Sequence, residues 1–366
     1  MRPPASGALL ALGLIGLTGV LVGVLGVSGV TRGVLPPTFA EASQPSSEVT
    51  LRSHVIERDG TRLRIEYCGN GPLVPDPDVR RLLIMIHGTG GEACGYAEVG
   101  VEAAQLAGQL HDTLVVVPHF ITHDDPAAEH EPDRLYWTRG GWKPGANSRD
   151  TPYARPWRMS SFAVVDDLVL TAAAVLPDLE DTVIAGHSAG GQFSNRYAAS
   201  TRVAGDARFV VANPSSYLYL DARRFSGDRF VVPDEGVIDA CPEYDTYKYG
   251  MEGLYAYLRS VGPERLRTQY GERDVAYLLG EHDDDPAATS LDTRCAAGLQ
   301  GAHRLERGQR YHASLAHLYD ASIHDRHTLT TIPGVAHGAR AIYTSPEGRA
   351  VLFGPDAATG TDEPGP

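Results

Sequence analysis

The sequence predicts an α/β fold: a mostly parallel eight-stranded sheet with helices on both faces and two long loop insertions. Apolar, β-branched runs alternate with segments of helical periodicity, which is typical of a parallel sheet with crossover helices. The runs at 81–87 (RLLIMIH) and 114–118 (LVVVP) are apolar almost throughout, as expected for strands buried on both faces. The predicted folded domain begins instead with two strands in which apolar and polar residues alternate. Asp59-Gly60 lies between them and is a strong hairpin signal.

The expected strands cover residues 49–57, 62–67, 81–87, 114–118, 182–185, 208–213, 275–280 and 328–332, with helices over 96–110 and 192–199. Two long segments, 119–159 and 214–271, interrupt the alternation. Segments of this length inside a compact domain are usually lids or binding loops, and structural padding is the alternative. We expect their aromatic side chains, represented by Trp137, Trp142 and Tyr217, to line an apolar substrate pocket.

The N-terminal segment predicts export. Residues 7–30 carry no charge and are rich in Leu, Val and Ile. This run is longer than the core of about 7–15 residues in a signal peptide, and it meets the length of about 20 residues that a membrane span needs. Either a cleaved signal, with a small-residue site at Ala40-Glu41-Ala42, or a retained anchor fits. The protein is therefore expected to be secreted, or membrane-anchored with its folded domain outside the cell.

Composition also predicts how the chain is divided into segments. We expect a signal or anchor over 1–34, a Pro- and Ser-rich linker over 35–48, one folded domain over 49–353 and a disordered acidic tail over 354–366. The formal net charge of −14 argues against nucleic-acid partners and against a basic patch for anionic lipid.

The four cysteines fit an exported protein, in which disulfides can persist. Cys241 and Cys295 both follow predicted strands, so they should lie near the same face of the sheet and form a bridge. Cys68 and Cys94 are expected on opposite edges, too far apart for the roughly 7 Å Cα separation that a disulfide requires. We expect these two to be small buried residues instead.

The most informative motif is Gly-His-Ser-Ala-Gly at residues 186–190, between a predicted strand and a predicted helix. Gly-x-Ser-x-Gly in that context is a nucleophile elbow, a turn so sharp that its flanking residues must be small. The motif exposes the hydroxyl of Ser188 above the sheet. An ordinary strand–helix turn is the alternative. Ser188 is the predicted nucleophile.

A serine nucleophile needs a base that an acid orients, and in this architecture they follow in the order Ser, Asp or Glu, His. Asp283 comes directly after the strand expected over 275–280 and is the predicted acid, with Asp284 and Asp285 as alternatives. His337 follows the last strand, between small residues, and is the predicted base. The alternative for His337 is an isolated surface histidine.

The Gly-rich loop at 87–91 (HGTGG) follows the third strand, where this architecture places one backbone N–H of the oxyanion hole. The other N–H comes from the residue after the nucleophile. Thr89 and Ala189 are the predicted donors, with Gly88 as a near alternative. The loop lacks the Gly-Lys-Ser/Thr of a phosphate-binding P-loop. This chemistry requires no metal or organic cofactor.

The segments IMIHGTGG, VIAGHSAGGQ, YLLGEHDDDP and IPGVAHG resemble the α/β-hydrolase superfamily across roughly residues 50–353. The finer pattern, including VANPSSYLYL and QGAHRLERG, is similar to exported bacterial and fungal esterase-like α/β-hydrolases. This resemblance implies the fold, a Ser-Asp-His triad and ester-type chemistry. We expect the substrate to be a small-molecule or lipid-like ester. An acyltransferase or peptidase with the same triad, or a non-catalytic surface binding protein on the same fold, are the alternatives.

Overall fold

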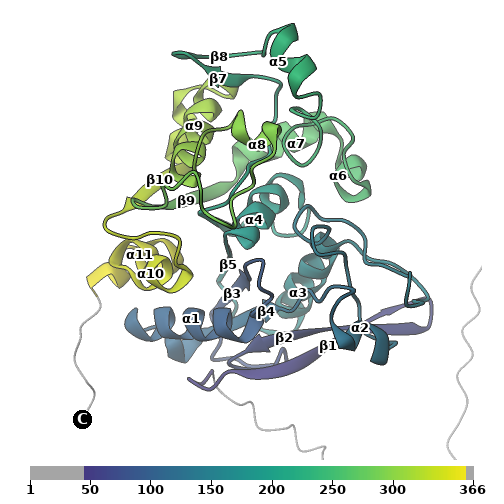
Figure 1. The fold of residues 1–366 in the computed structure, drawn as a ribbon. Helices are drawn as coiled ribbons and strands as arrows, with labels where there is room; N and C mark the ends of the chain where they lie inside the picture. Colours follow the sequence, from purple (N-terminus) through teal and green to yellow (C-terminus); the bar gives the residue numbers. More distant parts are fainter. Residues whose placement is uncertain (1–44, 360–366) are drawn as a thin grey trace, which may run out of the picture. The chain divides into compact units, whose positions relative to one another are not determined.

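The computed structural model describes residues 45–359 (Figure 1). The apolar run at 7–30 and the candidate cleavage site at 40–42 lie outside the described residues. No helix of the part that is described is long and apolar enough to cross a membrane.

A central eight-stranded sheet organises this part of the chain, with strand order β1-β2-β4-β3-β5-β6-β9-β10. β1 and β2 form the expected antiparallel hairpin, β2 also runs antiparallel to β4, and all other neighbours are parallel. The strands are β1 (Thr50–Arg58), β2 (Thr61–Gly69), β3 (Arg81–Ile86), β4 (Thr113–Pro118), β5 (Asp181–His187), β6 (Arg208–Ala212), β9 (Asp274–Gly280) and β10 (His327–Ile332). The fold class and all eight predicted strands are confirmed.

Helices cover both faces of the sheet, because alternate residues of the parallel strands are buried on opposite sides (Figure 1). Leu82 and Ile84 of β3 face the core shared with α3, α4, α7 and α9. Leu83 and Met85 face the core shared with α1, α10 and α11. The helices are α1 (Ala93–Leu106), α2 (Pro126–His130), α3 (Ser161–Val175), α4 (Ala189–Ser200), α5 (Glu235–Ala240), α6 (Ala256–Val261), α7 (Pro263–Glu272), α8 (Cys295–Gly298), α9 (Arg304–Leu318), α10 (Ala339–Thr344) and α11 (Pro346–Phe353), with 3-10 turns at η1 (Leu110–Asp112), η2 (Ala321–Asp325) and η3 (Pro355–Thr359).

The two insertions are ordered and packed against each other. The first holds α2, and the second holds α5, α6, α7 and a small hairpin of β7 (Arg224–Ser226) and β8 (Arg229–Val231). The Tyr247 hydroxyl of the second insertion donates a 2.5 Å hydrogen bond to the Pro144 carbonyl of the first. Trp137, Trp142 and Tyr247 all belong to the main hydrophobic core. The insertions are therefore part of the fold, not loose extensions of it.

Both cysteine pairs form disulfides. The expected bridge between Cys241 and Cys295 is present, with Cα atoms 5.7 Å apart. The expectation for the other pair is wrong, because Cys68 and Cys94 are also bridged, with a Cα separation of 4.9 Å. The strand order places β2 beside β4, and α1 packs over both strands. The first turn of α1, which carries Cys94, therefore meets the end of β2.

The folded region extends past the predicted boundary at residue 353. Residues of the expected disordered tail form η3, and Arg349 of α11 donates hydrogen bonds to the carbonyls of Ala357 and Ala358. The small side chain of Ala357 is buried against the core under α11. Residues 360–366 lie outside the described part of the chain.

Candidate active site

Ser188 alone makes the turn between β5, which ends at His187, and α4, which begins at Ala189. Its backbone has φ 58° and ψ −113°, a conformation that non-glycine residues adopt only when the surrounding structure enforces it. The enforcement is steric. A Cβ atom at Gly186 would lie 2.1 Å from the Gly190 carbonyl oxygen, and one at Gly190 would lie 1.9 Å from that of Ile86. The two motif glycines are thus required by close backbone contacts.

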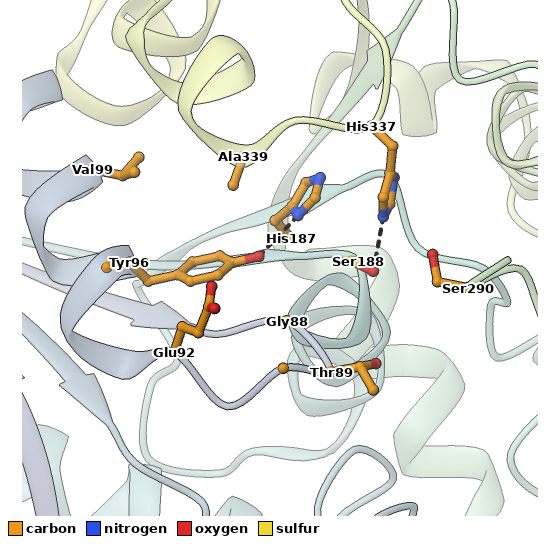
Figure 2. Close-up of a pocket in the computed structure, with 12 residues that line it drawn as sticks. Gly88, Thr89, Glu92, Tyr96, Val99, His187, Ser188, Ser290, His337 and Ala339 are labelled. Atoms are coloured by element: carbon orange, nitrogen blue, oxygen red, sulfur yellow. Dashed lines mark hydrogen bonds between the residues drawn. The ribbon is translucent and has the colours of Figure 1, made fainter. Parts of the chain in front are cut away.

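His337 is hydrogen-bonded to both Ser188 and Asp283, and Figure 2 shows its contact with Ser188. Its Nε2 is 3.0 Å from Ser188 Oγ, and its Nδ1 is 2.7 Å from Asp283 Oδ2. A neutral imidazole has one N–H and one acceptor nitrogen. With the proton on Nδ1 and donated to Asp283, Nε2 is free to accept the serine proton. The structure thus brings the three predicted residues into one hydrogen-bonded chain.

Asp283 is held by a second partner that the sequence did not reveal. Arg304 Nη1 donates to Asp283 Oδ1 at 3.2 Å, and both side chains are buried, at 1% and 4% exposed. Asp284 and Asp285 are exposed to solvent, and Asp285 accepts a hydrogen bond from the Ala287 amide. Of the three adjacent carboxylates, only Asp283 contacts His337 among the hydrogen bonds of the described residues.

Direct backbone contacts hold the acid loop and the base loop together. The amide of His282 donates to the Val335 carbonyl at 2.8 Å. A Cβ atom at Gly280 would lie 2.5 Å from that same carbonyl oxygen. Asn213, at the end of β6, accepts a hydrogen bond from the Gly280 amide through Oδ1 at 2.9 Å. The ends of β6, β9 and β10 are therefore fixed to one another beside the nucleophile.

Two backbone N–H groups are free to bind an oxyanion. Within residues 45–359, the Thr89 amide has no hydrogen-bond partner. Ala189 is the first residue of α4, where helix N–H groups have no intrahelical acceptor. The carbonyl of Gly88, the alternative donor, accepts a hydrogen bond from His87 Nδ1 at 2.8 Å. Burial lowers the pKa of His87 to about 4, so this histidine anchors the loop in its neutral form.

Solved structures share this arrangement of elements. The chain matches poly(aspartic acid) hydrolase-1 from Sphingomonas sp. KT-1 with a TM-score of 0.55 and 22% identity, over 83% of this chain and 98% of that one. It matches the poly(3-hydroxybutyrate) depolymerase LpqC from Bordetella parapertussis with a TM-score of 0.56 and 19% identity, over 86% and 90% of the two chains. The chain has the α/β-hydrolase fold. No protein-family model matches the sequence, and no curated protein sequence matches it significantly.

The candidate site opens into a pocket of 430 Å³, which is lined in part by Ser188, His337, Thr89, Gly88 and Tyr96 (Figure 2). The Tyr96 hydroxyl is hydrogen-bonded to Nδ1 of His187 at 3.0 Å, and burial raises the Tyr96 pKa to about 12. The ring of His187 lies 4.6 Å from that of His337. No local pattern in the sequence predicts this contact between His187 and His337.

His187 lies against the base without competing for its proton. Burial, and then the charge that His337 acquires, hold the pKa of His187 well below its ordinary value. A neutral ring beside His337 supports its orientation without repelling the imidazolium form. The His187 Nδ1 atom is occupied by Tyr96, so the pair forms one rigid wall of the pocket.

The three aromatic residues predicted to line the substrate pocket are not among those around Ser188. Trp137 is fully buried and donates its indole N–H to the Ala146 carbonyl. Tyr217 is fully buried and stacks on Tyr311 with ring centroids 4.4 Å apart. For these two the expectation is wrong, because the insertions fold back into the core. Trp142 lines a neighbouring pocket of 420 Å³ that shares Thr89 with the site.

Proposed function

We propose that this chain is an exported serine hydrolase that cleaves carboxylic esters through an acyl-enzyme. The observation that carries the proposal is the continuous chain from Ser188 Oγ through His337 to Asp283, at 3.0 and 2.7 Å, beside two free backbone N–H groups. Serine is a weak nucleophile without an oriented base, and this geometry supplies one.

In the first half-reaction, Ser188 Oγ attacks the ester carbonyl carbon while its proton passes to His337 Nε2. The carbonyl electron pair moves onto oxygen, where the N–H groups of Thr89 and Ala189 stabilise the negative charge. Asp283, which is ion-paired with Arg304, stabilises the imidazolium. The tetrahedral intermediate then expels the alcohol, whose oxygen takes the proton from His337.

In the second half-reaction, His337 removes a proton from a water molecule whose oxygen attacks the acyl carbon. The acid leaves as the Ser188 ester bond breaks, and His337 returns the proton to Ser188 Oγ. Every step uses side chains and backbone groups of this chain, without a metal or organic cofactor. The pocket of 430 Å³ suits a small-molecule or lipid-like ester.

Export is part of the proposal and rests on independent features. Two disulfides, Cys68–Cys94 and Cys241–Cys295, are of the kind that persists in oxidising compartments. The uncharged run at 7–30 supplies either a signal or an anchor, so membrane attachment through this run belongs to the same proposal. The net charge of −14 supports a non-nucleic-acid substrate.

The test is hydrolysis of a chain-length series of 4-nitrophenyl esters by the purified protein and by Ser188→Ala. We expect the substitution to lower kcat by about 10⁴-fold or more, as for other serine triads. Undiminished hydrolysis by Ser188→Ala would contradict the assignment. Product analysis with added alcohols and amines distinguishes hydrolysis from acyl transfer, since a transferase would favour these acceptors over water.

A further inference from the structure

The chain contains only two lysines, and both line one pocket beside the nucleophile. Lys143 and Lys248 are the two lysines in the sequence, and the other strongly basic residues are all arginine. They come from different insertions, yet both border a pocket of 330 Å³ that shares Thr89 and Ser290 with the pocket of Ser188. In Figure 2, Ser290 lies on the side of Ser188 away from Tyr96, and Thr89 lies below Ser188.

The fold holds the two lysines together. The hydrogen bond from the Tyr247 hydroxyl to the Pro144 carbonyl joins the residues next to each lysine in the chain. Arg196 of α4, which is fully buried, donates to the Lys248 carbonyl at 3.2 Å. Lys143 Nζ donates to Thr89 Oγ1 at 3.1 Å, on the loop that carries the candidate oxyanion donor. These contacts fix the backbone of Lys248 and the ammonium group of Lys143 at the pocket.

The charges in this pocket do not balance. Lys248 is paired with Asp292 at 3.1 Å, and Asp292 is also the carboxylate that contacts Arg294. Lys143 has no ion-pair partner anywhere in the described chain, although its surroundings are largely desolvated. The buried Arg196 guanidinium lies behind the pocket and adds positive potential. The acidic group that acts on Lys143 is Asp292, which already pairs with Lys248 and Arg294. A half-buried ammonium with no carboxylate at ion-pair distance, in a protein of net charge −14, is a site for an anion.

We propose that this lysine pocket binds a carboxylate carried by the substrate, so that the enzyme prefers esters bearing a free carboxyl group near the scissile bond. The inference rests on the ester-hydrolase function proposed above and names its substrate class. Lysine suits this role because its compact ammonium acts as a point charge in a small pocket. Gln192, Ser215 and Thr289 supply further polar groups along the wall. A single carboxylate matches the single unpaired ammonium of Lys143.

The test compares kcat/KM for pairs of esters that differ only in charge, followed by pH-stat titration. Methyl hydrogen glutarate and its terminal carboxamide place the charge on the acyl side. 4-Acetoxybenzoate and 4-acetoxybenzamide place it on the alcohol side. We expect wild-type protein to prefer the anionic member of at least one pair by about 10- to 100-fold, as for a charge-assisted hydrogen bond. The pair that shows the preference tells which side of the ester faces the lysines.

Variants locate the effect. Lys143→Met and Lys248→Met should each reduce the preference by about tenfold or more, whatever they do to the rate on the neutral ester. Arg229→Met removes the same charge at an exposed residue of β8 that does not line the pocket, and it should leave the preference unchanged. An equal reduction by all three variants would contradict the inference, since it would indicate only a long-range charge effect.

A pH series provides a readout that does not depend on a variant folding. Burial and the neighbouring Arg196 lower the pKa of Lys248 to about 8, while Asp292 opposes the shift. The other titratable groups around the pair of Lys248 and Asp292 are Lys143, Arg294 and Tyr249. Lys248 loses its charge as the pH rises through about 8. The preference for the anionic ester should therefore fall between pH 7 and pH 9.5, and a constant preference would count against the inference.

Two failures are distinguishable. If wild-type protein hydrolyses neutral esters as well as or better than their anionic counterparts, the lysine pocket has no such role and the hydrolase function stands. If it hydrolyses neither member of either pair, nor any 4-nitrophenyl ester, the hydrolase function itself is wrong and the inference falls with it.

Discussion

Ser188 depends on residues that hold its partners rather than on the three triad side chains alone. Asp283 makes one hydrogen bond to His337 and one to Arg304, and the carboxylate and guanidinium are both buried. Removing one partner of a buried ion pair leaves an uncompensated charge, which is strongly destabilising. Arg304 also donates to Ser290 Oγ at 2.9 Å, at the border of the lysine pocket. We therefore regard Arg304 as a positioning residue for the acid.

Arg304→Met should lower kcat by about 10- to 100-fold, because Asp283 loses the contact that fixes its second oxygen and a small displacement of a catalytic group has an effect of that size. The loss of a nearby cation should also move the acid limb of the kcat/KM profile to higher pH. Arg304→Lys, which keeps the charge, should restore part of both properties. A reduced rate with an unmoved profile would mean that Arg304 stabilises only the fold.

The sequence predicts the three residues of this site, but it does not predict the side chains that hold them in position. Ser188, Asp283 and His337 follow from the motif and from the order of strands, which fixes where each loop ends. Arg304 and Tyr96 could not be found in this way. Their contacts depend on how α9 and α1 pack against the sheet, and no local pattern in the sequence records that packing.

The formation of the site depends on contacts between the loops at the ends of the strands. β9 ends at Gly280, where the chain passes so close to the loop after β10 that a side chain has no room. Asn213 at the end of β6, with φ 44°, joins the same junction through its hydrogen bond from the Gly280 amide. The position of His337 therefore depends on backbone contacts between three loops.

Gly280→Ala should displace the loop that carries His337, because its Cβ would lie 2.5 Å from the Val335 and 2.6 Å from the Ala336 carbonyl oxygens. We expect kcat/KM to fall by about 10²-fold or more. Gly298→Ala is the matched control, since its Cβ would meet no atom within 4 Å. Equal activity of the two variants in an ester assay would show that the close approach at Gly280 does not position the base.

The strands were predictable from the sequence. The positions of the helices that cover the sheet were not, and one of the two disulfides was therefore not predicted. Continuous apolar runs identify buried parallel strands directly. The Cys68–Cys94 bridge depends on the sheet order, which puts β2 beside β4 under α1. Likewise, Trp137 and Tyr217 have the composition of pocket residues, yet they complete the core under the insertions. Composition does not distinguish a buried aromatic in a core from one in a pocket.

Cys68→Ala with Cys94→Ala should lower the free energy of unfolding by about 3 kcal/mol, because the bridge closes a loop of 26 residues in the unfolded chain. The measurement is urea unfolding of the double variant and of the reduced and oxidised wild-type protein. Since neither cysteine touches the triad, activity below the unfolding transition should be retained. A double variant as stable as the oxidised protein would contradict the structural role of the bridge.

At the scale of the whole molecule, buried neutral histidines make stability depend on pH. Burial lowers the pKa of His87 and of His327 from 6.5 to about 4. Between these values the unfolded chain binds more protons than the folded one, so stability is fully present above pH 6.5 and is lost as the pH falls toward 4. Burial raises the pKa of Asp166 and of Asp245 above the ordinary value of 3.8. These two carboxyl groups have the opposite effect on stability, but only in the acidic range in which carboxyl groups titrate.

The free energy of unfolding should therefore decrease between pH 7.5 and pH 5, by on the order of 1 kcal/mol per pH unit for each of the two histidines where they titrate. Urea unfolding at a series of pH values measures this slope. His327→Phe should make the slope shallower if the variant folds. A free energy that stays level or rises as the pH falls through this range would contradict the buried, neutral state of these histidines.

The whole molecule brings two distant insertions together around one serine. Lys143 and Lys248 line one pocket beside that of Ser188 because the insertions pack on each other and on α4. The sequence predicts lids or binding loops with aromatic pocket residues, and the structure places the two lysines of the insertions, not Trp137 or Tyr217, at a pocket beside that of Ser188. The central claim remains that Ser188 is an activated nucleophile.

Labelling with a fluorophosphonate probe, followed by mass spectrometry of the labelled peptide, tests that claim most directly. Fluorophosphonates react with a serine whose base and oxyanion donors are in place. We expect one adduct on the peptide that contains Ser188, absent in Ser188→Ala and strongly reduced in His337→Asn. A correctly folded wild-type protein that takes no label, or takes it at another residue, would contradict the account.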